Sequence, residues 1–358
     1  MSTELSERVV NGLREAVGAA YVRSDASALE QYGIDALGIS HLPDLVVIPA
    51  DTQDIAAVAK LCNEHRVPLV VRGAGTGYTG GAVPTRGGVV LSMERLNRII
   101  EIDELNLLAV VEPNVITGDL QRAVEKVGLF YPPDPASLEK SSIGGNVAEC
   151  AGGPRAFKYG TTKRYVLGLE AVLPTGEVIE TGSKAVKNVV GYDLTQLLVG
   201  SEGTLAIVTR ITLRLVPKPP AQATLLAMFT DIQGAVDAVT ALIHRRVVPA
   251  AIELMDADSL DAVRHHTGRE IAPPGTGAAV IVEVDGSQAA VDEDLDRVLK
   301  ACRDVGAIRV TVASTVEERD QLWGLRREMS LALRATGLLS RKLTQSALMR
   351  QRYTAHTV

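Results

Sequence analysis

Five glycines stand within nine residues of one stretch, which is the first part of the chain whose composition suits chemistry. The stretch reads Arg72-Gly-Ala-Gly-Thr-Gly-Tyr-Thr-Gly-Gly81 and follows the apolar run of residues 69–71. Glycine permits positive φ and lets backbone N–H groups approach a ligand closely. Successive N–H groups of this kind bind anions, and Arg72 adds a positive charge. A flexible surface turn is the alternative, but the position directly after a buried strand favours a phosphate site.

The segment after the glycines distinguishes between the known phosphate loops. The glycine spacing matches the dinucleotide fingerprint, which requires a crossover helix of at least about 10 residues after the glycines. Here Pro84 and Gly87-Gly88 follow instead, and residues 89–91 already form the next apolar run. A Walker loop is excluded too, because no Gly-Lys-Ser/Thr follows. The sequence therefore predicts a turn between strands that binds phosphate through backbone amides, without a helix.

A second stretch of small residues reads Ser141-Ser-Ile-Gly-Gly-Asn-Val-Ala-Glu-Cys-Ala-Gly-Gly153. Its glycines permit close backbone contact, and Ser141, Ser142 and Asn146 supply polar groups. We interpret it as a loop cluster that forms a wall against a flat ligand; a small-residue helix packed in a core is the alternative. Cys150 lies within it, and a small buried side chain is favoured over a reactive thiol.

A third candidate lies on the last predicted helix, residues 317–336. Trp323, Arg326 and Ser330 share one face of it at i, i+3 and i+7. A guanidinium beside an indole suits a substrate carboxylate, because arginine presents paired N–H donors. A solvated arginine is the alternative. The opposite stripe is apolar and predicts a core face: Leu322, Leu325, Met329, Ala332 and Leu333.

Composition bounds the remaining functions. With 358 residues, 46% hydrophobic content and a net charge of −6, the chain has room for two or three domains and is not a general nucleic-acid binder. The acidic N-terminus lacks a signal-peptide core, which indicates a cytoplasmic protein, and membrane association would at most be peripheral. Neither the six histidines nor the cysteines have metal-site spacing, so we expect no metal; the cysteines are Cys62, Cys150 and Cys302.

The elements that position these motifs alternate between helix and strand. Before the boundary the patterns predict helices over 4–20, 52–64, 117–127 and 192–199, and strands over 45–48, 69–71, 89–93, 97–103, 107–112, 165–173, 177–180 and 205–216. Pro217-Lys-Pro-Pro220 stiffens the chain and marks the best domain boundary. Beyond it, strands over 225–229, 251–254, 278–284 and 308–312 and helices over 232–245 and 291–305 predict an α+β domain on an antiparallel sheet.

Three long motifs in order resemble the FAD-linked oxidases of the vanillyl-alcohol-oxidase or PCMH type. They span residues 71–81, 142–153 and 191–208, the last reading Gly191-Tyr-Asp-Leu-Thr-Gln-Leu-Leu-Val-Gly-Ser-Glu-Gly-Thr-Leu-Ala-Ile-Val208. The chain is most similar to glycolate oxidase flavin subunits, beside D-lactate and D-2-hydroxyglutarate dehydrogenases. The resemblance implies an α+β fold: a two-part FAD-binding domain followed by an α+β substrate (cap) domain.

The same resemblance implies a domain division. Residues 1–41 would be an N-terminal helical segment, 42–218 the FAD-binding PCMH-type domain, 219–339 an incomplete substrate domain and 340–358 a divergent tail. Family members continue further and supply metal-binding and acid–base histidines there. We therefore expect a truncated C-terminus that lacks this catalytic segment, and no catalytic residue is assigned.

By its match to the family, the glycine loop would bind the pyrophosphate of non-covalent FAD, since Tyr78 stands where some relatives attach flavin through histidine. Cys150 is a remote alternative for attachment. The implied pyrophosphate residues are Arg72, Gly73, Ala74, Gly75, Thr76, Gly77, Thr79, Gly80 and Gly81. Those implied along the ribityl chain and flavin are Pro133, Asp134, Ser141, Ser142, Gly144, Gly145 and Asn146. Further implied cofactor-binding residues are Ala148, Gly152, Gly153, Tyr159 and Gly160. Those implied at the adenine are Glu202, Gly203, Ile207 and Val208.

The implied activity is oxidation of a small 2-hydroxy acid such as glycolate to the 2-oxo acid, by hydride transfer to flavin. Arg326, in a Trp-x-x-Arg pattern, would bind the substrate carboxylate. A second flavin-type subunit and an iron–sulfur subunit would be partners. D-lactate or D-2-hydroxyglutarate as substrate is one alternative. A flavin-binding protein made inactive by loss of the C-terminal segment is another.

Overall fold

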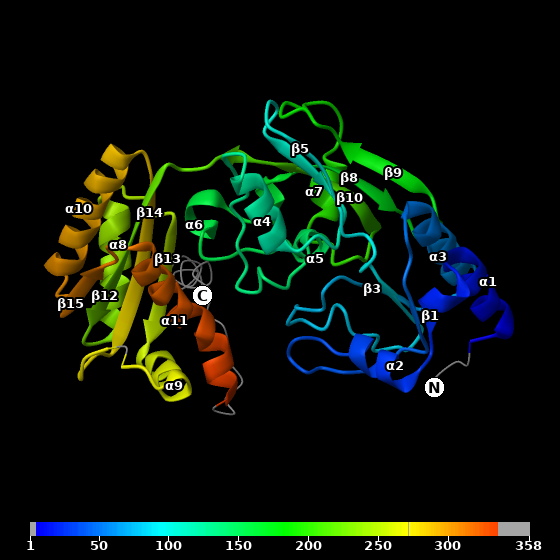
Figure 1. The fold of residues 1–358 in the computed structure, drawn as a ribbon, viewed down its shortest axis with the longest axis horizontal. Helices are drawn as coiled ribbons and strands as arrows, with labels where there is room; N and C mark the ends of the chain where they lie inside the picture. Colours follow the sequence, from blue (N-terminus) through cyan, green and yellow to red (C-terminus); the bar gives the residue numbers. More distant parts are fainter. Residues whose placement is uncertain (1–4, 271, 336–358) are drawn as a thin grey trace, which may run out of the picture. The chain divides into compact units, whose positions relative to one another are not determined.

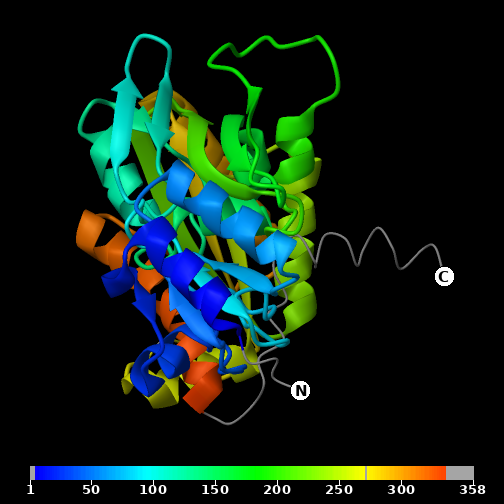
Figure 2. The ribbon, with the colours of Figure 1, turned by 90° about the vertical axis from the view of Figure 1, so that its right-hand side faces the viewer.

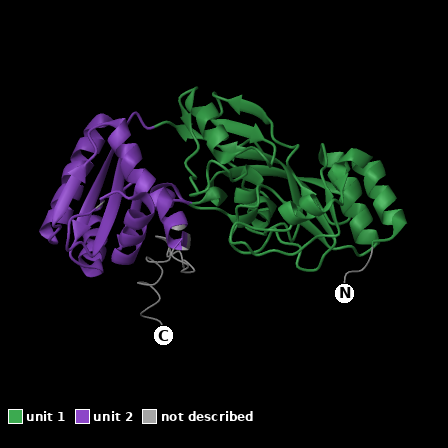
Figure 3. Ribbon diagram, turned by 60° about the horizontal axis from the view of Figure 1, so that its bottom comes forward, with its two compact units in different colours: residues 1–152, 161–218 green, residues 153–160, 219–358 purple. Residues whose placement is uncertain are grey.

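The computed structural model describes residues 5–270 and 272–335, which form two compact units (Figures 1 and 3). Unit 1 comprises residues up to 152 together with residues 161–218. Unit 2 comprises residues 153–160 and the chain from residue 219 onward. The short excursion at residues 153–160 has no counterpart in the sequence patterns, because eight residues carry too little periodicity to show which core they join.

The first sheet of unit 1 carries the glycine loop at the end of one strand. Its strand order is β1, β2, β4, β3, with bounds Val22–Arg23, Leu45–Val47, Val89–Ser92 and Leu69–Arg72. Both β2 and β3 run parallel to β4, so helix α3 (Thr52–Glu64) is the crossover between them. Asp51 caps α3 by accepting from the N–H groups of Gln53 and Asp54. Helix α1 (Glu7–Val17) shares its core, while α2 (Ala26–Tyr32) packs on the opposite face.

The second sheet of unit 1 is wholly antiparallel, in the order β5, β6, β10, β8, β9. These strands span Ile99–Asp103, Leu108–Val111, Ile207–Arg214, Val166–Val172 and Val178–Gly182. The predicted strand over 205–216 corresponds to β10, whose alternate residues from Ile207 to Leu213 are buried. The other elements here are η1 (Ala19–Tyr21), α4 (Thr117–Glu125), β7 (Leu129–Phe130) paired with β11 (Val216–Pro217), α5 (Ile143–Glu149), η2 (Thr162–Arg164) and α7 (Leu194–Leu198).

Unit 2 is a four-stranded antiparallel sheet in the order β13, β14, β12, β15. The strands span Ala251–Asp256, Ala278–Gly286, Ala221–Phe229 and Arg309–Val312. Successive residues of β12 alternate between two cores. Helices α8 (Ile232–His244) and α10 (Gln288–Asp304) contribute to one core, and α9 (Ala257–Thr267) and α11 (Val316–Ala335) to the other, so helices cover both faces (Figure 1). The short helix α6 (Ala156–Tyr159) belongs to this unit.

The α+β class is confirmed, and the departures from prediction are local. Helix α9 is missed, because its buried residues Leu260, Ala262 and Val263 give only a weak helical stripe. Val127 is 37% exposed rather than inward, since α4 ends two residues before it. Cys62 and Cys302 are buried, which raises their thiol pKa values to about 12 and about 11 and fits a packing role.

One loop of unit 1 exposes several large hydrophobic side chains. Residues 183–193, between β9 and α7, extend away from the sheet (Figure 2). Val189, Val190 and Tyr192 on this loop are between 77% and 95% exposed. Among the helices of the described residues, none has the length and apolar character needed to cross a membrane.

Candidate functional site

The two small-residue stretches meet in unit 1. The glycine loop leaves β3 after Arg72, and Gly75 and Gly80 have φ of +66° and +80°, a region that favours glycine. A Cβ atom at Gly73 would lie 2.4 Å from Ser142 Oγ, and one at Gly77 would lie 2.5 Å from Glu149 Oε1. The loop therefore packs directly on α5, at a distance that a larger side chain would prevent.

Arg72 is a buried cation at the base of this loop. Arg72 is 9% exposed, and its Nη1 donates to the backbone oxygen of Ile34 at 2.7 Å. Its guanidinium carbon lies 6.0 Å from the ring centroid of Tyr32, and within the part of the chain that the structure describes it forms no ion pair. Burial lowers the pKa of Arg72, while Tyr32 and Asp35 oppose that shift. A desolvated cation without an anionic partner suits an anionic ligand.

The stretch 141–153 is built around a short helix. The prediction of a loop is therefore wrong for its backbone, which is helical as in the alternative. Ser142 begins α5 by accepting from Gly145 N–H at 3.3 Å. Asn146 is buried, and its Nδ2 donates to Thr117 Oγ1 at 2.6 Å. Cys150 ends the helix with φ of +49° and is only partly buried, its Sγ lying 3.3 Å from Thr161 Oγ1.

The turn of residues 200–203, which belongs to the motif of residues 191–208, also contacts α5. The N–H of Glu202 donates to the oxygen of Ala148 at 2.9 Å, so the turn of residues 200–203 is fastened to α5. A Cβ atom at Gly81 would lie 3.5 Å from Glu202 Oε2. Ile207 is buried and begins the strand that follows, with Val208 half-buried. We call the glycine loop, α5 and this turn the cradle.

Acidic side chains line one side of the cradle. Burial raises the pKa of Glu149, and the charges of Glu202 and Asp35 raise it further. No group of three or more His, Cys, Asp or Glu side chains among the described residues could hold a metal ion. The donors of the cradle are backbone amides, hydroxyls and one guanidinium, a set that fits the phosphates of a dinucleotide.

Arg326 lies in unit 2 within a buried polar cluster, so the alternative of a solvated arginine is wrong. Its Nε donates to Glu253 Oε2 at 2.7 Å, and the two side chains are 15% and 8% exposed. On the neighbouring strand Glu283 Oε2 accepts from Trp323 Nε1 at 2.8 Å and from Thr224 Oγ1 at 2.7 Å. The cluster therefore fixes α11 on β13 and β14, and the carboxylate-binding role of Arg326 stays a prediction.

Three residues predicted to bind the cofactor, Gly153, Tyr159 and Gly160, lie in unit 2 rather than with the cradle. Tyr159 OH donates to Asp285 Oδ2 at 2.6 Å. Lys158 Nζ pairs with the same carboxylate and donates to the Asp285 backbone oxygen at 2.9 Å. No sequence signal marked Asp285, because its partners lie more than a hundred residues away. Pro133 and Asp134 are buried in unit 1.

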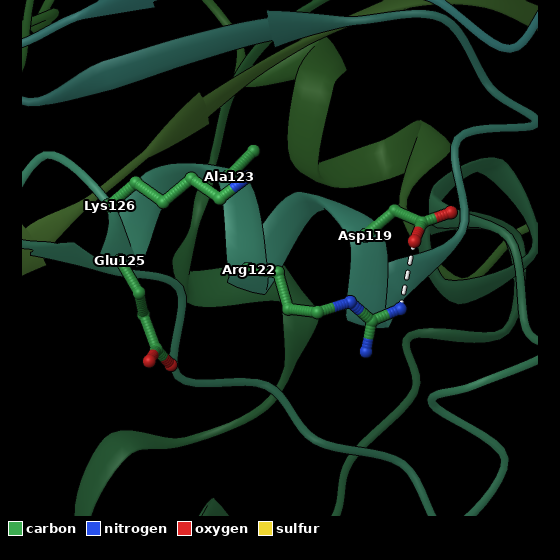
Figure 4. A pocket seen from close by; sticks show the side chains of 5 residues that line it. All are labelled: Asp119, Arg122, Ala123, Glu125 and Lys126. Carbon is green, nitrogen blue, oxygen red and sulfur yellow. Dashed lines mark hydrogen bonds and ion pairs between the residues drawn. The ribbon is translucent and has the colours of Figure 1, made fainter.

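A surface hollow beside α4 is not part of either cluster. It is lined by Asp119, Arg122, Ala123, Glu125 and Lys126 (Figure 4). Arg122 is tied to Asp119 at 2.8 Å and to Glu139 at 2.9 Å, and all three side chains are more than half exposed. Exposed charges that satisfy one another attract a ligand only weakly.

Comparison with known families assigns both halves of the chain. Residues 43–182 match the family model for an FAD binding domain, and residues 218–344 match that for the C-terminal domain of FAD linked oxidases. The structure resembles p-cresol methylhydroxylase with a TM-score of 0.75 at 23% identity, over 90% of this chain and 68% of that one. It also resembles alkyldihydroxyacetonephosphate synthase at 0.75 and 20%, over 92% of this chain and 63% of that one.

Curated relatives are more similar in sequence. Glycolate oxidase subunit GlcD of Bacillus subtilis is 46% identical over 82% of this chain and 62% of its own length. D-lactate dehydrogenase of Anaerostipes hadrus is 35% identical over 83% of this chain and 64% of its own. GlcD of Escherichia coli K12 is 37% identical over 93% and 66%. The chain thus spans somewhat less than two thirds of the relatives it matches.

Proposed function

Because the chain belongs to the FAD-linked oxidases, we propose that its cradle binds the pyrophosphate of FAD and that unit 2 binds a small 2-hydroxy acid. The single observation that supports the first part is Arg72, a buried guanidinium at the base of a glycine loop that has no ion pair with any residue the structure describes. The backbone N–H groups of that loop would supply the remaining contacts to the pyrophosphate. Ser142 and Asn146 would lie beside the ribityl chain, from the helix on which the loop rests.

The side chains of unit 2 would orient the substrate. Glu253 accepts from Nε of Arg326, and among the described residues the two Nη groups have no hydrogen-bond partner, so they could contact a carboxylate bidentately. The ion pair also fixes the guanidinium plane, which reduces the entropy lost when an acid binds. When bound, the flavin supplies the hydride acceptor for the substrate α-carbon.

The names of the relatives support the substrate class. One set is named as glycolate oxidase subunits and another as D-lactate dehydrogenases. Both names describe small 2-hydroxy monocarboxylates, so we propose glycolate as the first substrate to test and D-lactate as the second. D-2-hydroxyglutarate follows, because a second carboxylate would meet Glu253 and Glu283 near the guanidinium. The word subunit in the GlcD name supports a role within a complex, with a second flavin-type subunit and an iron–sulfur subunit as the proposed partners.

Anaerobic absorbance spectroscopy tests this function directly. Purified chain reconstituted with FAD is mixed with glycolate, D-lactate or D-2-hydroxyglutarate, and the visible absorbance band of the oxidised flavin is followed. We expect bleaching with at least one acid. Bound flavin that no acid bleaches would favour the alternative of a flavin-binding protein without turnover.

Substrate binding can be separated from turnover through Trp323, the only tryptophan in the sequence. It lies one helical turn from Arg326, so its emission reports on the polar cluster. We expect the emission of Trp323 to change saturably when glycolate is added, and we expect this change to be lost in Arg326→Gln. The Arg327→Gln variant, which neutralises the adjacent arginine, is the matched control. A response that both variants retain would contradict the role of Arg326.

A further inference from the structure

Three carboxylates surround the glycine loop of the cradle, although the loop is suited to an anion. Glu149 comes from α5, Glu202 from the turn of residues 200–203 and Asp35 from the loop after α2. Oε1 of Glu149 lies 2.5 Å from the position of a Cβ atom on Gly77. The backbone oxygen of the same glycine accepts from Ala36 N–H at 3.3 Å, which places the Asp35 loop beside it.

Asp35 is the most unusual of the three. It is 7% exposed, and its Oδ1 accepts from the N–H groups of Leu37 at 2.8 Å and Ile39 at 3.0 Å. Its Oδ2 is buried and accepts no hydrogen bond from any described residue. Buried carboxylate oxygens are rarely left without a donor, because the desolvation cost is then uncompensated.

The charged groups that act on Glu149 are negative. Asp35 and Glu202 are the charged groups that act on Glu149, and both are acidic. Arg72 stands at the base of the loop and interacts with Asp35. Tyr78 is the other titratable group on the loop and is 37% exposed. The surroundings of the glycine loop therefore include three carboxylates and one guanidinium, which interacts with Asp35.

A pyrophosphate diester would add two negative charges to this imbalance. Negative charge near a partly buried carboxyl favours its protonated form, so the added charges favour proton uptake at Glu149. We propose that binding of FAD at the cradle is coupled to the uptake of one proton by the carboxylate of Glu149, whose Oε1 lies against the glycine loop at Gly77. This inference rests on the proposed function, because it assumes that the pyrophosphate occupies the glycine loop.

The sign of the coupling follows from linkage. Glu149 has a raised pKa in the free protein, and the bound anion raises that pKa further. Between the free and bound pKa values the complex holds one more proton than the free protein, so Kd rises by up to about tenfold per pH unit as pH increases. Below the free-state pKa and above the bound-state pKa, Kd is independent of this group.

The test is an FAD titration of the full chain between about pH 5 and pH 9, the range in which a raised carboxyl pKa titrates, at constant ionic strength. Flavin fluorescence gives Kd, and calorimetry in two buffers of different ionisation enthalpy counts the protons taken up. We expect Kd to rise with pH by a factor approaching ten per unit over part of this range. Proton uptake should approach one in the same interval.

Variants identify the acceptor. Glu149→Gln should flatten the pH slope and bind FAD more tightly than wild type at high pH, since it removes a negative charge without removing bulk. Glu104→Gln, an exposed position on the β5–β6 turn, is the matched control and should follow wild type. Circular dichroism establishes that each variant is folded.

The outcomes separate this inference from the proposed function. Tight FAD binding with a flat pH profile and no proton uptake would overturn the coupling and leave the proposed function intact. A slope that Glu149→Gln retains in full would overturn the assignment of Glu149. A folded chain that binds no FAD at any pH would overturn both.

Discussion

The cradle of unit 1 and the polar cluster of unit 2 treat buried charge in opposite ways. In unit 2 each buried carboxylate has a donor: Glu253 has Arg326, Glu283 has Trp323 and Thr224, and Asp285 has Lys158 and Tyr159. Within residues 5–270 and 272–335, Arg72 of the cradle has no ion pair and Asp35 has an oxygen without a donor. Charge in the polar cluster of unit 2 holds its own elements together, whereas on the proposed function the charge of the cradle serves a ligand. Substitution should therefore reduce stability in unit 2 and ligand affinity in unit 1.

The largest expected effect is in unit 2. Glu253→Ala leaves a buried guanidinium without its acceptor and should lower the free energy of unfolding by about 3 kcal/mol, as is typical for breaking a buried ion pair from one side. Urea denaturation followed by Trp323 emission measures it. Asp261→Asn, which breaks the exposed pair with Arg264, is the control and should change stability by less than about 0.5 kcal/mol. Equal effects would remove the contrast between the units.

Arg72→Met is the corresponding substitution in the cradle of unit 1. Loss of the cation should weaken FAD binding at least about tenfold, equivalent to about 1.4 kcal/mol. The free energy of unfolding should fall by less than about 1 kcal/mol, because no buried anion loses its ion pair. Arg86→Met makes the same charge change at an exposed position of the following loop and should bind FAD as wild type does. A destabilised Arg72→Met with normal affinity would make this arginine a structural residue.

A smaller effect tests the packing of α5 beneath the glycine loop. A Cβ atom at Gly144 would lie 2.9 Å from the Pro113 backbone oxygen, whereas one at Gly145 would meet only Ser142 Oγ at 3.1 Å. Gly144→Ala must therefore displace the helix and should weaken FAD binding several-fold, by about 1 kcal/mol. Gly145→Ala should cost less than half of that. The reverse order in parallel fluorescence titrations would show that α5 does not set the cradle geometry.

The two regions also differ in how far the sequence could predict them. The cradle follows from local composition, because glycine runs, small residues and a capped helix are visible within short stretches, and the strand before Arg72 is a simple apolar run. The polar cluster depends on pairing between distant strands and helices. Glu253 and Glu283 are single acidic residues within apolar strands, and nothing local indicates that Arg326 and Trp323 will reach them.

Segment boundaries show the same limit. For residues 141–153 the sequence is compatible with a loop or a helix, because glycine and alanine give no clear hydrophobic period. In the structure, residues 143–149 form a helix. The excursion of residues 153–160 into unit 2 is decided by Lys158 and Tyr159 meeting Asp285. The predicted tail of residues 340–358 lies outside the described residues.

The most direct test of the account is equilibrium titration of the full chain with FAD. We predict saturable binding with one FAD per chain, abolished or strongly weakened in Arg72→Met and unaffected in Arg86→Met. A folded wild-type chain that binds no FAD, or one that binds it equally well without the Arg72 guanidinium, would contradict the central claim that the cradle keeps its charge for the cofactor.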